Sequence, residues 1–79
     1  MNVEHLIEMA NQIGEFFGSM PDREEALTSI ADHIRRFWEP RMRRTILASL
    51  DDPEASATMS PIVREALTRT REALTPQAG

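Results

Sequence analysis

The sequence predicts an all-α fold, a small bundle of three to four short helices in a single domain over residues 1–79. Apolar residues recur at three- and four-residue spacing along most of the chain, which is the period of an amphipathic helix. Capping residues or prolines precede each of these stretches, and no stretch shows the alternation that a β-strand requires. With 79 residues, of which 41% are hydrophobic, the chain is long enough for one small domain.

Four helical segments are expected, each begun by a capping or proline signal. They span about residues 2–17, 22–38, 40–50 and 61–74, followed by a frayed tail over 75–79. Asn2 and Asp22 are residue types that favour the N-cap position, whereas Pro40 and Pro61 suit the first turn of a helix. Residues 51–59 are mostly small or polar, and this composition predicts a loop.

The predicted apolar stripes carry more large side chains than one small core holds. Met9, Phe16, Phe37 and Trp38 lie on or beside the stripes. We expect some of them to remain exposed in the monomer, covered by a partner or by self-association of the isolated chain. Gly14 lies inside the first helix, where glycine costs about 1 kcal/mol relative to alanine, so we expect another helix to cross closely there.

The composition excludes several kinds of functional site. There is no cysteine, which removes disulfides, thiolate metal sites, iron–sulfur clusters and a cysteine nucleophile. The two histidines, His5 and His33, lack the spacing of a metal-binding motif, and no glycine-rich phosphate loop is present. We therefore expect no catalytic, cofactor-binding or metal-binding residue. No apolar run approaches the roughly 20 residues of a membrane span, and no secretory signal is evident, so a cytoplasmic location is expected.

The charges divide the chain into acidic ends and a basic middle. The net charge is −4, distributed as −6 over residues 1–32, +4 over 33–50 and −2 over 51–79. All nine basic residues are arginine. A basic segment within an acidic chain indicates a contact surface.

The basic segment supplies the candidate partner-binding residues, which are Arg35, Arg36, Phe37, Trp38, Arg41 and Arg44. Docking on a protein is one interpretation, because arginine and tryptophan are enriched among the residues that anchor interfaces. Pairing within the chain is the alternative, in which Arg41 and Arg44 contact carboxylates of the first helix. Those carboxylates belong to Glu4, Glu8 and Glu15. Binding to nucleic acid is a third interpretation, which the negative net charge disfavours.

Three stretches of the sequence together match a family pattern. They are residues 30–43 (Ile-Ala-Asp-His-Ile-Arg-Arg-Phe-Trp-Glu-Pro-Arg-Met-Arg), residues 9–14 followed by Phe16 and Phe17, and residues 60–63. On these motifs the sequence resembles the small delta subunit of NAD-dependent formate dehydrogenase of the cytoplasmic molybdenum or tungsten type. The resemblance spans residues 6–67 and leaves residues 51–59 without a matching motif.

The resemblance implies a subunit of a complex that oxidises formate to carbon dioxide and reduces NAD. In that family the alpha subunit carries a molybdenum or tungsten bis-pterin and iron–sulfur clusters, while the beta and gamma subunits carry FMN and further clusters. The delta subunit has no assigned cofactor and is associated with assembly or stability. We therefore expect a non-catalytic accessory subunit that docks on the alpha subunit. A transient maturation factor assisting cofactor insertion and a small helical DNA-binding regulator remain the alternatives.

Overall fold

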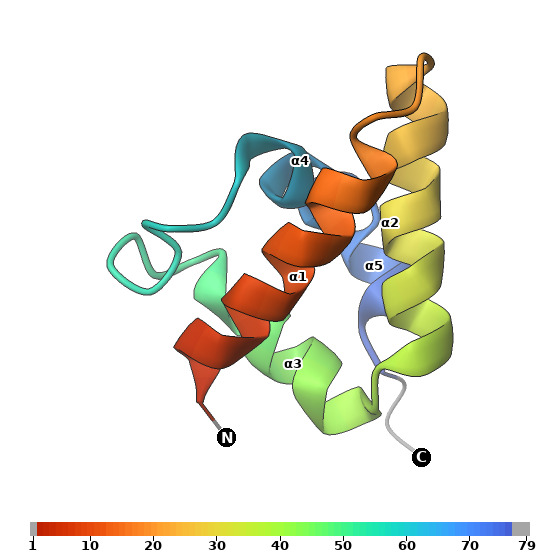
Figure 1. Ribbon diagram of the computed structural model, residues 1–79. Helices are drawn as coiled ribbons and strands as arrows, with labels where there is room; N and C mark the ends of the chain where they lie inside the picture. Colours follow the sequence, from red (N-terminus) through yellow and green to blue (C-terminus); the bar gives the residue numbers. More distant parts are fainter. Residues whose placement is uncertain (1, 77–79) are drawn as a thin grey trace.

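The computed structural model describes residues 2–76, which form five α-helices and no strand (Figure 1). This architecture confirms the predicted all-α class. The helices are α1 (Val3–Phe17), α2 (Arg23–Phe37), α3 (Pro40–Ser49), α4 (Pro61–Arg69) and α5 (Arg71–Leu74). The first three agree with the predicted ranges to within one residue at each end.

The helix starts follow the capping signals of the sequence. Asn2 and Asp22 each accept hydrogen bonds from two first-turn amides, at 2.9 and 3.4 Å for Asn2 and at 3.0 and 3.4 Å for Asp22. Pro40 and Pro61 occupy the first position of α3 and α4. Ser60 is the N-cap residue of α4, but its side chain makes no capping hydrogen bond. The prolines therefore mark these two starts more than side-chain caps do.

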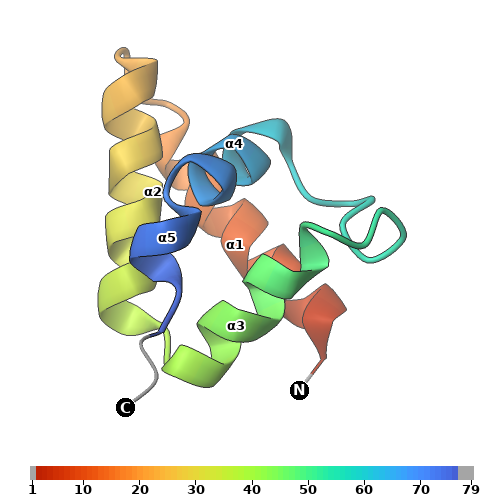
Figure 2. The same ribbon diagram turned by 180° about the vertical axis from the view of Figure 1, so that it is seen from behind.

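The predicted last helix over residues 61–74 is wrong in one respect, because it is broken at Thr70 into α4 and α5. The Thr70 backbone leaves the helical region at φ −112° and ψ 18°, and its hydroxyl donates to the Ala66 carbonyl at 2.7 Å. The break redirects α5 alongside α2 (Figure 2), and Leu74 ends 1% exposed. Of the predicted tail, residues 77–79 lie outside the described residues.

The core lies where α1 meets α2, α3 and α4, and α5 closes one side of it. Aliphatic side chains from all five helices are almost completely buried in it: Ile7, Ile30, Ile34, Ile46, Val63, Leu67 and Leu74. Two further core residues, Trp38 and Met59, lie in the segments between helices. Their side chains are 5% and 6% exposed. The predicted apolar stripes therefore converge on one core.

The predicted close helix crossing at Gly14 is confirmed between α1 and α4. A Cβ atom on Gly14 would lie 2.6 Å from Val63 Cγ2 and 3.2 Å from Ile62 Cγ2. Only a residue without a side chain allows the two backbones to approach this closely. Gly14 lowers the helix propensity of α1 but allows α4 to pack closely against it.

The segment between α3 and α4 forms turns, and its far end is fixed to α1. The Asn11 side chain donates to the Thr58 carbonyl at 2.9 Å and accepts from the Ser60 amide at 2.9 Å. Ser56 is 1% exposed, and its carbonyl accepts from Arg64 at 2.9 Å. This region lacks the helical pattern, as predicted, but it is held by specific hydrogen bonds.

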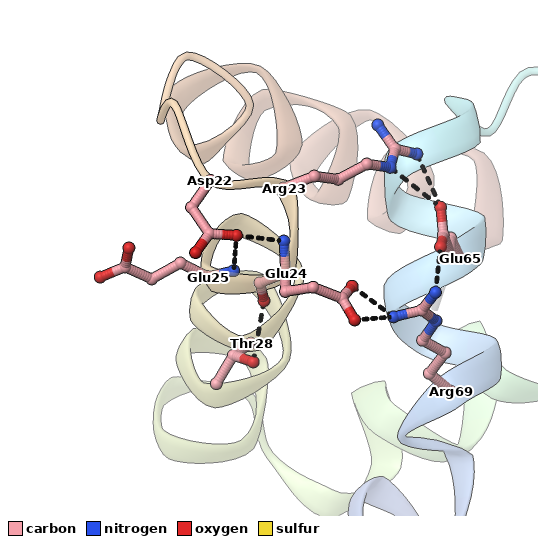
Figure 3. A network of polar contacts seen from close by, with 7 residues as sticks. All are labelled: Asp22, Arg23, Glu24, Glu25, Thr28, Glu65 and Arg69. Atoms are coloured by element: carbon pink, nitrogen blue, oxygen red, sulfur yellow. Dashed lines mark hydrogen bonds and ion pairs between the residues drawn. The ribbon is translucent and has the colours of Figure 1, made fainter.

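A network of ion pairs joins α2 to α4, as Figure 3 shows. Arg23 contacts Glu65 at 2.7 Å, and Glu65 contacts Arg69 at 2.9 Å. Arg69 also reaches Glu24, with one N–O distance of 2.7 Å. These side chains are at least partly solvent-exposed, so each pair contributes modestly and the network chiefly fixes the relative position of the two helices.

The Glu65→Gln variant is expected to lose a pH-dependent part of the stability. The hydrogen bond from Arg23 holds the pKa of Glu65 below its ordinary value of 4.5, with the charges of Arg23 and Arg69 acting in the same direction and burial opposing them. A lowered folded-state pKa stabilises the fold above the unfolded pKa, and this stabilisation is lost as pH falls through the folded value. Thermal unfolding of both proteins between pH 7 and pH 3 measures it. The wild type should melt higher at pH 7, with the gap closing below about pH 4.5; a constant gap would contradict the assignment.

Candidate functional site

Two surface features of the described residues stand apart from the core. We call the first the aromatic face; it comprises Met9, Ile13, Phe16 and Phe17 of α1 together with His33 and Phe37 of α2. We call the second the arginine groove; it is lined by Arg35, Arg36, Pro40, Arg43, Arg44, Glu72, Ala73, Thr75 and Pro76. Within residues 2–76 no cluster of three or more histidine or carboxylate side chains is placed to hold a metal ion.

The aromatic face exposes two phenylalanines. Phe16 is 73% and Phe37 is 71% exposed, and they are the large hydrophobic side chains that lie open on the described surface. The rings form a row in which Phe16 contacts Phe17 (centroids 5.0 Å apart), Phe17 approaches His33 (6.2 Å), and His33 contacts Phe37 (4.8 Å). The expectation that some large apolar side chains remain exposed is confirmed for these two.

The row follows from helix geometry. Phe16 and Phe17 lie in the last turn of α1, while His33 and Phe37 are four residues apart on α2 and therefore share one side of that helix. Because α1 packs against α2, the two pairs meet at the junction. Beside them a depression of about 430 Å³ is lined by parts of α1, by His33 and by Trp38.

The prediction that Trp38 is a partner-binding residue is wrong, because its side chain is buried. Trp38 follows Phe37 directly but is only 5% exposed, whereas Phe37 is 71% exposed. At Trp38 the backbone changes from helical to extended (φ −95°, ψ 135°) while its amide still donates to the Ile34 carbonyl. Trp38 lies four residues after the buried Ile34 and therefore continues the core side of α2, whereas Phe37 lies on the outer side. Trp38 is therefore a core residue.

The arginine groove is a depression of about 610 Å³ between the end of α2, the start of α3 and the segment around α5. Arg36 is already paired with Asp32 at 3.1 Å. Arg43 donates to the Leu74 carbonyl at 3.3 Å, and its buried Nε has no hydrogen-bond partner. Arg35 and Arg44 form no ion pair with any carboxylate of residues 2–76.

The alternative interpretation, in which Arg41 and Arg44 pair with carboxylates of the first helix, is not found among the described residues. No arginine forms an ion pair there with the carboxylates of that helix, which belong to Glu4, Glu8 and Glu15. The reason is that α1 turns its apolar side toward its neighbours, so these carboxylates lie exposed. Arg41 is also exposed, on α3 but outside the groove.

The long-range ion pairs instead use other arginines. Arg23 and Arg69 hold α2 to α4, and Arg71 binds Asp51 at a hydrogen-bonded contact that lowers the pKa of that carboxyl group. Among the five arginines of the basic segment, Arg36 forms a local ion pair and Arg43 donates to a backbone carbonyl. The other three form no ion pair with the described residues.

The wall of the groove that the segment around α5 supplies cannot be predicted from the sequence. This wall consists of Glu72, Ala73, Thr75 and Pro76, which reach the arginines only because the chain breaks at Thr70. Arg43 also lines the groove, although it was not among the predicted partner-binding residues. A local pattern carries no information about which distant segment completes such a wall.

Together, the fold and these two surfaces define a small all-α protein whose described surface carries an aromatic face and an arginine groove. Among residues 2–76 no helix is both long enough and apolar enough to cross a lipid bilayer. A family model for the NADH-dependent formate dehydrogenase delta subunit FdsD matches residues 5–67, which include the aromatic face and the four groove arginines. The chain therefore belongs to this family of subunits of a formate dehydrogenase complex. Comparisons with curated proteins and with solved structures gave no match.

Proposed function

We propose that this chain is a non-catalytic accessory subunit that docks on the catalytic alpha subunit of formate dehydrogenase and stabilises or assembles the complex. The observation that carries this proposal is the aromatic face, where Phe16 and Phe37 are more than 70% exposed. Fully burying a phenylalanine side chain stabilises by roughly 1.5–3 kcal/mol, so covering both rings would contribute substantially to association.

Electrostatics and residue type support the same proposal. Arginine and aromatic side chains are enriched at protein interfaces, whereas lysine, which this chain lacks, is depleted. Arg35, Arg36, Phe37, Arg41 and Arg44 remain the proposed partner-binding residues. Trp38 is no longer one of them, because its side chain is buried.

The proposal places the redox chemistry in the other subunits. The resemblance assigns the molybdenum or tungsten bis-pterin and iron–sulfur clusters to the alpha subunit, and FMN with further clusters to the beta and gamma subunits. This chain would then hold no cofactor, work in the cytoplasm with its complex, and be inactive toward formate when isolated. A transient maturation factor would use the same exposed face, but it would leave the complex after cofactor insertion.

The Phe16→Ser/Phe37→Ser variant tests the docking surface. We expect its affinity for the alpha subunit to fall by about 100-fold or more, since two buried rings are removed from the interface. The measurement is co-purification from cells expressing all four subunits, followed by titration of the purified alpha subunit. The melting temperature of the isolated variant should change by only a few degrees, because both side chains are exposed.

The matched control is Ala57→Ser/Thr68→Ser, two exposed positions outside both surfaces. This control should bind as the wild type does. Unchanged affinity of a folded Phe16→Ser/Phe37→Ser protein would contradict the assigned surface. Recovery of fully active enzyme without this chain, after a stage at which it was bound, would favour the maturation factor over the permanent subunit.

A further inference from the structure

We infer that the arginine groove binds an acidic segment of the partner subunit, whose carboxylates pair with Arg35 and Arg44. This inference rests on the proposed function, because it names the chemistry that the docked partner presents. The aromatic face would receive apolar side chains of the partner, and the groove would receive its charges.

The charges in the arginine groove are unbalanced. Four guanidinium groups line one depression, two from the end of α2 and two from α3, and Glu72 is the one carboxylate among the lining residues. Like charges gathered at one place repel each other unless counter-charges are supplied. Within residues 2–76, no arginine–carboxylate ion pair other than that of Arg36 with Asp32 involves these four arginines.

The groove arginines also keep free hydrogen-bond donors. A guanidinium group offers five N–H donors in a rigid fork. Arg35 and Arg44 have no ion-pair partner among the described residues, and Arg43 keeps its buried Nε without an acceptor while its Nη1 binds the Leu74 carbonyl. A ligand with several acceptor oxygens would pair with the exposed donors of Arg35 and Arg44.

The start of α3 adjoins the groove. Glu39 is the N-cap residue of this helix, but it makes no side-chain capping bond, and Pro40 at the first position lines the groove. The N-terminal end of a helix carries a partial positive charge that favours anions nearby. It therefore adds to the field of the four arginines.

The size of the groove and the net charge of the chain favour one kind of anion. Arginine forks fit carboxylates and phosphates alike. The groove has a volume of about 610 Å³ and runs along three elements, so it suits an extended segment better than one small ion. A nucleic acid would also face the acidic remainder of a chain whose net charge is −4. An acidic protein segment is extended as well, and it confines its negative charges to the few residues that lie in the groove, away from the acidic remainder of the chain.

The groove is also continuous with the aromatic face. Arg36 lines the groove, and it also lines a smaller depression together with Phe17, His33 and Phe37. One partner can therefore cover both surfaces at once, with its acidic segment next to its apolar contact.

The first experiment titrates the full chain with acetyl-Glu₆-amide while the arginine Nε–Hε resonances are followed by NMR. We expect resonances of Arg35 and Arg44 to shift, and the neutral acetyl-Gln₆-amide to leave them unchanged. Arg44→Gln should weaken the binding at least about tenfold, as expected for the loss of a charge-assisted contact. Arg64→Gln is the matched control, because it removes the same charge from an exposed position of α4 that lies outside the groove and outside the proposed partner-binding residues.

Each outcome of this titration decides the inference. Equal weakening by Arg64→Gln and Arg44→Gln would show general charge attraction and overturn the assigned site. Absence of any Glu₆-dependent shift, or tighter binding of inorganic phosphate at the same resonances, would overturn the acidic segment as the ligand.

The second experiment uses the complex and separates this inference from the proposed function. Arg35→Gln/Arg44→Gln should lower the affinity for the alpha subunit at least about tenfold and reduce its salt dependence. If this variant binds normally while Phe16→Ser/Phe37→Ser does not, the groove inference is wrong and the docking function stands. If the wild-type chain does not associate with the complex, the proposed function is wrong, and the peptide titration still tests the groove.

Discussion

Trp38→Ala is expected to leave the isolated chain largely unfolded at 25 °C. Replacing a buried large aromatic residue by alanine destabilises by about 3–5 kcal/mol, through lost burial and the cavity that remains. The core of a domain this small supplies no more than about 3–5 kcal/mol of net stability. Trp38 is 5% exposed and packs in the same core as the isoleucines of α1 and α2, so the full loss applies. Far-UV circular dichroism during urea unfolding measures the effect.

The neighbouring residue provides a matched control. Phe37→Ala removes an aromatic ring one position earlier, but this ring is 71% exposed. Its effect on the free energy of unfolding should stay near about 0.5 kcal/mol or below. Equal destabilisation by the two substitutions would contradict the placement of Trp38 in the core and of Phe37 outside it.

Gly14→Ala is expected to destabilise the fold by about 1–2 kcal/mol, although alanine is the better helix former. The added Cβ would lie 2.6 Å from Val63 Cγ2, so α1 and α4 must move apart or Val63 must change rotamer. Val63 is β-branched, lies inside a helix and is completely buried, which leaves it little freedom to adjust. The melting temperature should fall by roughly 5–15 °C.

A double-mutant cycle with Val63→Ala identifies the cause. Val63→Ala alone should destabilise, because it removes buried methyl groups. In the Val63→Ala background, however, Gly14→Ala should be neutral or stabilising, since the clashing Cγ2 atom is gone and helix propensity now favours alanine. An equal loss in both backgrounds would place the effect elsewhere than at the helix crossing.

Much of the fold could be predicted because its determinants are local. Asn2 and Asp22 accept first-turn amides as their residue types suggest, and Pro40 begins α3 because a proline suits the first turn. The helix crossing at Gly14 was also predicted, since a glycine inside a strong helical pattern indicates close approach. The break at Thr70 could not be predicted, because no glycine or proline marks it and packing of α5 against α2 accompanies it.

The surfaces were predicted less completely, for a different reason. The basic segment identified Arg35, Arg36 and Arg44 as surface residues, but which arginines find partners depends on helix packing. Arg23 and Arg69 pair with acids 42 and 45 residues away in the sequence. The helical period places Trp38 on the buried side of α2, four residues after Ile34, but the same apolar stripe includes Phe37, which is 71% exposed, so periodicity alone does not separate the two residues.

The position of Trp38 gives the protein an internal spectroscopic reporter. The indole belongs to the core but also lines the depression beside Phe16 and Phe17, so it lies directly next to the aromatic face. It is the one tryptophan of the chain. A chain labelled with 5-fluorotryptophan therefore carries a single ¹⁹F resonance, which reports occupancy of the aromatic face without any change to the surface that a partner would contact.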